Sequence, residues 1–259
     1  MKRQLKYLWG RLLDFFGQKE KARDIFNAVD EGTDLQIKQS LVQINNSLGN
    51  LEAALEHLRE MEELVSERDR YKRILESEID TLLKLNRHEE ALEILQEEDQ
   101  EDPDILGMTA AVASGMEGKA GVAQKYAEKV LGQNPEDAKA HFILGGVEYQ
   151  RDNYQQALTH YQKIWEQDFS PKIALGGLIA CYLELDELEK AEEYLEKLEN
   201  DYEQHLTTYF NRARLEYKSG NLEESYKILQ KLKPHVEEAK ISGDVFFDFY
   251  KQVRNEIQD

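Results

Sequence analysis

The chain has 259 residues, of which 33% are charged and only four are proline, a composition typical of a long helical protein. Its formal net charge of −19 would repel phosphate backbones, which argues against nucleic acid as a partner. A single cysteine, Cys181, rules out a disulfide framework and indicates a reducing compartment, so we expect a cytoplasmic protein.

The first 24 residues are the basic segment of the chain, with a net charge of +4, whereas the rest carries −23. Apolar residues alternate with the basic ones at helical spacing, so residues 1–16 could contact an anionic membrane or dock into the acidic body of a second copy. The same segment could instead be the first helix of a repeat array. Arg11 and Asp14 interrupt the apolar run, so no signal peptide is predicted. The basic residues are Lys2, Arg3, Lys6, Arg11, Lys19, Lys21 and Arg23.

Small residues recur along the chain at intervals of 32 to 37 residues, and the last three intervals are 34. Five residues before each one lies a glycine, asparagine or aspartate, types that tolerate the left-handed backbone at a helix end. An apolar segment with helical periodicity precedes and follows each stop, so each unit is predicted to be a helical hairpin. The small residues are Ala22, Ala54, Ala91, Ala123, Ala157, Ala191 and Ser225. The stops are Gly17, Gly49, Asn86, Gly118, Asp152, Asp186 and Gly220.

At this register the chain resembles the tetratricopeptide repeat family, whose 34-residue unit has Leu-Gly in its first helix and alanine and an aromatic in its second. The best matches are Leu144 and Gly145 with Tyr154, Ala157 and Tyr161. The resemblance implies an all-α fold, a right-handed α-solenoid of about seven hairpins plus a C-terminal capping helix at 241–259. The solenoid covers residues 1–240, with units at about 3–34, 35–71, 72–103, 104–137, 138–171, 172–205 and 206–240.

The sequence offers no catalytic, cofactor or metal site. Its six histidines are scattered, and no glycine-rich phosphate loop, nucleophile elbow or calcium loop occurs. The acidic run from Glu97 to Asp104 could attract a basic partner or a divalent ion, but a solvated loop between repeats is the preferred interpretation. The longest nearly uncharged stretch, from Ile173 to Leu183, is too short to cross a bilayer. We therefore expect a protein that is not an enzyme.

The resemblance also implies a binding surface, because the first helix of each repeat lines a concave groove in this family. The groove positions of the last four units are mostly apolar, with Arg214 among their few cations, so a clamp for two carboxylates is not expected. Glycine inside a helix costs roughly 0.5 to 1 kcal/mol; at Gly146 and Gly176 either a closely approaching ligand or close repeat packing could compensate. The expected groove residues are Ile105, Met108, Val112, Met116, Phe142, Gly146, Tyr149, Gly176, Ala180, Leu183, Phe210, Arg214 and Tyr217.

These observations predict a non-catalytic scaffold or adaptor that binds an apolar or amphipathic segment of a partner protein in its groove. The alternatives are a peripheral membrane assembly factor anchored by the N-terminal helix, or a homo-oligomeric scaffold. Solenoid folds serve many unrelated functions, so the partner itself does not follow from the pattern.

Overall fold

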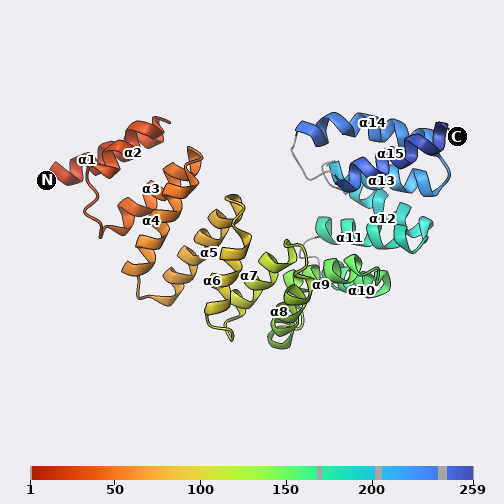
Figure 1. The fold of residues 1–259 in the computed structure, drawn as a ribbon, viewed down its shortest axis with the longest axis horizontal. Coiled ribbons are helices and arrows are strands. Elements are labelled where there is room, and N and C mark those ends of the chain that lie inside the picture. The colour runs from red at the N-terminus through yellow and green to blue at the C-terminus, as the bar shows by residue number, and fades with distance from the viewer. Residues whose placement is uncertain (1, 168–170, 202–205, 239–243, 259) are drawn as a thin grey trace. The chain divides into compact units, whose positions relative to one another are not determined.

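Helices alternate with short turns throughout the computed structural model, which describes residues 2–167, 171–201, 206–238 and 244–258. These residues form fifteen α-helices and no strand, so the all-α prediction is confirmed (Figure 1). The chain divides into two compact units, Met1–Asp99 and Gln100–Asp259.

The first unit contains six helices that pair in chain order, α1 with α2, α3 with α4 and α5 with α6. Their bounds are α1 Lys2–Phe15, α2 Lys19–Asn27, α3 Leu35–Ser47, α4 Leu51–Leu64, α5 Arg68–Lys84 and α6 His88–Glu97.

The second unit contains nine helices among its described residues: four pairs from α7 to α14, and α15, which packs against α14. Their bounds are α7 Pro103–Ser114, α8 Ala120–Gln133, α9 Ala138–Gln150, α10 Tyr154–Glu166, α11 Pro171–Glu184, α12 Leu188–Asp201, α13 Leu206–Lys218, α14 Leu222–Glu238 and α15 Asp244–Gln258.

The turn inside each of the seven pairs has the left-handed backbone that the sequence predicts. All seven expected stops have positive φ, from 59° at Asp186 to 83° at Gly220. In most of these turns a backbone N–H just after the stop donates to a carbonyl five residues earlier, as from Asn153 to Glu148 at 2.9 Å, which satisfies a carbonyl at the helix end. The turn chemistry therefore fixes where each first helix ends.

The seven small residues lie where the two helices of a pair cross, and every one of them is fully buried. A larger side chain would push the two backbones apart. Ser225, the member with a polar group, satisfies its hydroxyl by donating to the Ala213 carbonyl at 2.7 Å. The residues four positions later, among them Phe26 and Tyr161, are also buried and fill the space between neighbouring helices.

The acidic segment around residue 100 forms a short turn between α6 and α7, in which Asp99 and Glu101 are exposed. Asp102 is buried and caps α7 by accepting from the backbone N–H of Asp104 at 3.0 Å. Arg68 pairs with Asp99 at 2.8 Å, and the Tyr71 hydroxyl donates to Glu98. The loop between repeats is thus present as expected, but Asp102 within it is buried and three of its carboxylates have partners in the structure.

Candidate partner-binding face

Three first helices of the second unit, α9, α11 and α13, pack side by side, with α11 against both of the others. Residues separated by 34 positions occupy equivalent places on them, because successive repeats in this part of the chain have that length. We use the term first-helix face for the accessible residues of α9 and α11 on this side: Phe142, Gly146, Tyr149, Gly176, Ala180 and Glu184.

The expected groove residues differ in how accessible they are. Phe142 is 46% exposed, whereas Ile105, Val112 and Leu183 are at most 4% exposed and belong to the core. Burial therefore removes these three from any accessible surface, since their side chains fill space between helices. The others are half-buried: Met108, Met116, Gly146, Tyr149, Gly176, Ala180, Phe210, Arg214 and Tyr217.

The glycines of α9 and α11 fall into two groups. A Cβ atom on Gly145 would lie 2.9 Å from Tyr161 Cζ, and one on Gly177 would lie 2.5 Å from Tyr161 Cδ1. These two glycines exist because the Tyr161 ring of α10 lies against both first helices. A Cβ on Gly146 would meet only the Tyr161 hydroxyl at 3.9 Å, and one on Gly176 would meet nothing within 4 Å. Close packing thus explains Gly145 and Gly177 and leaves Gly146 and Gly176 facing open space.

A charged cluster joins the three first helices at one end of the face. Arg214 of α13 pairs with Glu184 of α11, and its Nη2 also donates to the Tyr149 hydroxyl of α9 at 3.3 Å. That hydroxyl donates to Glu184 Oε1 at 3.2 Å. Burial raises the pKa of Tyr149, although the Arg214 charge opposes this rise. The side chains of Arg214 and Glu184 are 15% and 28% exposed, so a partner could still reach their outer edges.

Glu184 is a residue that the sequence analysis missed. It follows Leu183, which was chosen for the groove, and the helix turns the Leu183 side chain into the core instead. The repeat spacing could have identified Glu184 as accessible, because the residues at this position of three successive repeats are all polar: Gln150, Glu184 and Lys218. A polar residue at the same position of three repeats indicates a position that faces solvent.

The corresponding face of α13 is covered by α15 of the same chain. The ring centroid of Phe210 lies 5.9 Å from that of Phe246 and 5.8 Å from that of Phe249. The ring centroid of Tyr217 lies 5.2 Å from that of Phe249. Tyr217 also donates its hydroxyl to Glu256 at 2.7 Å. Phe210 and Tyr217, both expected to bind a partner, are therefore already occupied by an amphipathic helix of the chain itself.

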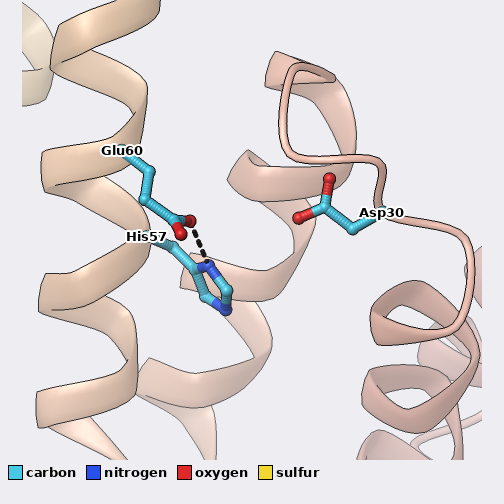
Figure 2. A group of neighbouring side chains, drawn as sticks. All are labelled: Asp30, His57 and Glu60. Atoms are coloured by element: carbon cyan, nitrogen blue, oxygen red, sulfur yellow. Dashed lines mark hydrogen bonds and ion pairs between the residues drawn. The ribbon is translucent and has the colours of Figure 1, made fainter.

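One group of side chains has the composition of a metal site. Asp30, His57 and Glu60 each offer a ligand atom, and these atoms lie within 4.8 Å of one another. Figure 2 shows His57 and Glu60 on one helix, joined by a hydrogen bond of 3.0 Å, with Asp30 facing them.

Lys38 supplies the positive charge for this group. Its Nζ lies 2.6 Å from Glu60 and 3.3 Å from Asp30, and its side chain is 1% exposed. Burial works against the charge of Lys38, but hydrogen bonds to both carboxylates hold its pKa above the usual value, and the bond from Lys38 lowers the pKa of Glu60. A metal ion would have to displace this ammonium group, so we assign the cluster to the internal structure of the first unit.

Cys181 lies in the core of α11 without solvent exposure, and burial raises the pKa of its thiol to about 12. The thiol is therefore neutral and inert, as expected for a packing residue. Among the described helices, none is long and apolar enough to cross a membrane.

The fold and this face define a class, a protein built from successive helical hairpins with accessible positions on the first helices α9 and α11. Sequence comparison identifies the hairpins more specifically: residues 117–172 and residues 148–209 each match a family model described as tetratricopeptide repeat. Residues 117–209 therefore match the tetratricopeptide repeat, which confirms over this part of the chain the resemblance read from the sequence. Such repeats generally serve as scaffolds for protein interactions. A search of curated proteins finds no match.

Solved structures with the same fold align with between 82% and 97% of this chain. A tetratricopeptide repeat protein from Parabacteroides merdae aligns with a TM-score of 0.74 and 16% identity, over 97% of this chain and 98% of that one. The pilF protein of Pseudomonas aeruginosa aligns with a TM-score of 0.56 and 20% identity, over 82% and 96% of the two chains. A chain of the Cut9–Hcn1 hetero-tetramer aligns with a TM-score of 0.60 and 11% identity, over 92% of this chain and 46% of that one. At these identities the likeness concerns the fold alone.

Proposed function

We propose that the chain is a non-catalytic scaffold or adaptor that binds an apolar or amphipathic segment of a partner protein on the first-helix face. The observation that carries this proposal is the contrast between α13 and the two helices before it. The positions of Phe210 and Tyr217, which α15 covers on α13, are accessible on α9 at Phe142 and Tyr149. On α11 the first of them, Gly176, is also accessible, whereas the second, Leu183, is buried. The chain's own helix is thus an example of the kind of segment that suits this face.

The composition of the face supports a helix or strand with apolar side chains as the ligand. Phe142 and Tyr149 supply aromatic surface, and Gly146, Gly176 and Ala180 keep the face low enough for a partner backbone to approach. Arg214 and Glu184 at one end would fix the direction of the bound segment through polar contacts. This division into an apolar contact and a polar edge is the usual arrangement for helix-in-groove recognition.

The expected affinity is modest. Burying on the order of 400 Å² of apolar surface contributes about 10 kcal/mol at 25 cal/mol per Å². Association costs of roughly 4 to 15 kcal/mol offset most of this gain. We therefore expect dissociation constants near the micromolar range.

The test is a comparison of the proteins that co-purify with wild type and with a Phe142→Glu, Gly146→Glu double variant. Both positions are accessible, so the variant should fold, which circular dichroism checks. A Glu189→Leu variant on the opposite helix of the next repeat serves as the control, because Glu189 is exposed on α12. Loss of a partner in the double variant alone supports the proposal, and retention of every partner contradicts it.

A further inference from the structure

The N-terminal helix α1 has two apolar sides. One side belongs to the core: Leu13 is buried, and a Cβ atom on Gly10 would lie 3.0 Å from the ring of Phe26. The other side is a stripe of six large side chains that are between 43% and 82% exposed. The apolar stripe consists of Leu5, Leu8, Trp9, Leu12, Phe15 and Phe16.

Part of the stripe occupies positions that neighbouring repeats bury. Counting from the turn glycines Gly17 and Gly49, Leu5, Trp9 and Leu12 correspond to Ile37, Leu41 and Ile44 of α3. Those three residues are at most 1% exposed and pack in the cluster that contains Leu13, Ala22 and Phe26 of the first hairpin. On α1 the equivalent positions are exposed instead, at 62% for Leu5, 53% for Trp9 and 43% for Leu12.

Equivalence to packed positions of other repeats does not account for the whole stripe. Phe15, 82% exposed, corresponds to Ser47 of α3, a polar residue that lies outside the packed positions. The stripe also contains only large side chains. When α1 and α9 are aligned by their turn residues Gly17 and Asp152, Leu5 corresponds to the small residue Ala140. Terminal repeats normally carry a polar outer face, which keeps an array soluble. A continuous ridge of leucine, tryptophan and phenylalanine is better suited to a fluid apolar phase than to close helix packing.

Charge distinguishes the surfaces that could cover the stripe. At 3.6 residues per turn, Lys6 and Arg11 fall on either side of the stripe, and both are exposed. Lys19 and Arg23 of α2 pair with Asp14 and Asp24, while the first 24 residues keep a net charge of +4 in a chain of −19. Two copies that meet through this helix would place like charges together, whereas anionic headgroups complement them. Long basic side chains beside an apolar stripe can reach headgroups while the stripe is inserted.

We infer that α1 is a membrane-contacting element, which lies in the interface of a bilayer with anionic lipids and inserts Trp9 and its apolar neighbours between the headgroups. The helix stays packed on α2 through its Gly10 and Leu13 side. Contact by a single helix of this kind is reversible and depends on salt and on lipid charge. This site is separate from the first-helix face of the second unit, and neither proposal depends on the other.

The experiment uses the full chain and vesicles of phosphatidylcholine with or without 30% phosphatidylserine, at low and high salt, in a flotation assay. The chain has two tryptophans, so Trp165→Phe leaves Trp9 as the fluorescent reporter of insertion. We expect flotation with anionic vesicles, a blue shift of Trp9 emission, and loss of both at high salt. Lys6→Glu and Arg11→Glu should each weaken binding roughly fivefold or more, because each basic residue near such a surface contributes about 1 kcal/mol.

The apolar contribution is tested with Leu8→Glu, Leu12→Glu, which should reduce flotation at least tenfold. The matched control is Val245→Glu, Ile257→Glu, which introduces the same charge at exposed apolar positions of α15 and should leave flotation unchanged. If the α1 variant fails to fold, Phe15→Glu changes the most exposed residue instead. Equal flotation of wild type and the α1 variant, or no flotation of wild type, would overturn the inference. So would a wild-type dimer in light scattering that the α1 variant dissociates without any vesicle binding.

Discussion

Gly176 of α11 and Phe210 of α13 occupy equivalent first-helix positions, yet only Phe210 is covered by another helix. On α13 the aromatic side chains of α15 pack against Phe210 and Tyr217. On α11 the equivalent of Phe210 is Gly176, and nothing within 4 Å of its missing side chain fills the space. On α13 this face packs against an amphipathic helix of the chain itself, whereas Phe142 and Tyr149 of α9 and Gly176 of α11 stay accessible at the equivalent positions.

The largest effect should follow from releasing α15. Val253 has no exposed surface, so Val253→Asp would bury a charge without a partner and should cost 3 kcal/mol or more. Hydrogen exchange of 206–218 and 244–258 should then increase, because Phe210 and Tyr217 lose their cover. Arg254→Asp, at an exposed neighbouring position, is the control. Unchanged exchange in α13 would mean that α15 does not protect this face.

A second prediction separates the open glycines from the packed ones. Gly177→Ala would force a Cβ to 2.5 Å from Tyr161, so we expect a loss of about 1 to 3 kcal/mol from overpacking. Gly176→Ala meets open space and should stabilise by roughly 0.5 to 1 kcal/mol, because alanine favours the helix. Urea unfolding of the two variants measures both. Equal destabilisation by the two substitutions would show that Gly176 is also a packing residue.

The pH dependence of stability in the first unit provides a reference that does not involve the first-helix face. Burial raises the pKa of Glu62 in α4 to about 8, and its hydrogen bond with Glu78 adds to this effect. The folded first unit therefore binds a proton more tightly than the unfolded chain does. The contribution of Glu62 to the stability of the first unit is therefore largest below pH 4.5, and it is lost as the pH rises towards 8.

We expect Glu62→Gln to remove this dependence and to stabilise residues 1–99 by about 1 to 2 kcal/mol at pH 8. Hydrogen exchange at pH 6 and pH 8 resolves the effect by region. Amides of α9 and α11 should not respond to the substitution. A response there, or a slope that persists in Glu62→Gln, would rule out this carboxyl as the source.

The smallest effect concerns the charged cluster that joins α9, α11 and α13. Glu184→Gln keeps an acceptor for Arg214 and Tyr149 but removes the negative charge, so we expect a loss of about 1 kcal/mol. Arg214→Gln should cost a similar amount, and the double variant should cost less than the sum of the two. Thermal unfolding of the four proteins completes the cycle. Strict additivity would show that the pair does not interact in solution.

The parts of the fold that depend on local chemistry could be predicted from the sequence. Asn86, Asp152 and Asp186 each lie five residues before a small residue, where the sequence predicts that a helix ends. All three have positive φ, as a helix end of this type requires. Ala157 and its equivalents are buried because the crossing of two helices requires small side chains. Both rules act over a few residues, so one sequence suffices to apply them.

The candidate site depends on which side of each helix faces the neighbours, and this was predicted less well. A one-residue difference separates Leu183, which is buried, from Glu184, which is accessible. The covering of Phe210 by Phe249 joins residues almost forty positions apart, and Lys38 reaches Glu60 from another helix. Contacts of this range follow from tertiary packing, which repeat positions alone do not determine.

Photo-crosslinking in cells would show directly whether the first-helix face binds a partner segment. A photoreactive amino acid is placed at Gly176 on this face or at Glu189 on α12 of the same repeat. We expect one partner segment, apolar or amphipathic in sequence, to be crosslinked from position 176 and not from position 189. The Phe142→Glu substitution should abolish this product. Equal crosslinking from both positions, or a product that persists in Phe142→Glu, would contradict the assignment of this face as the binding site.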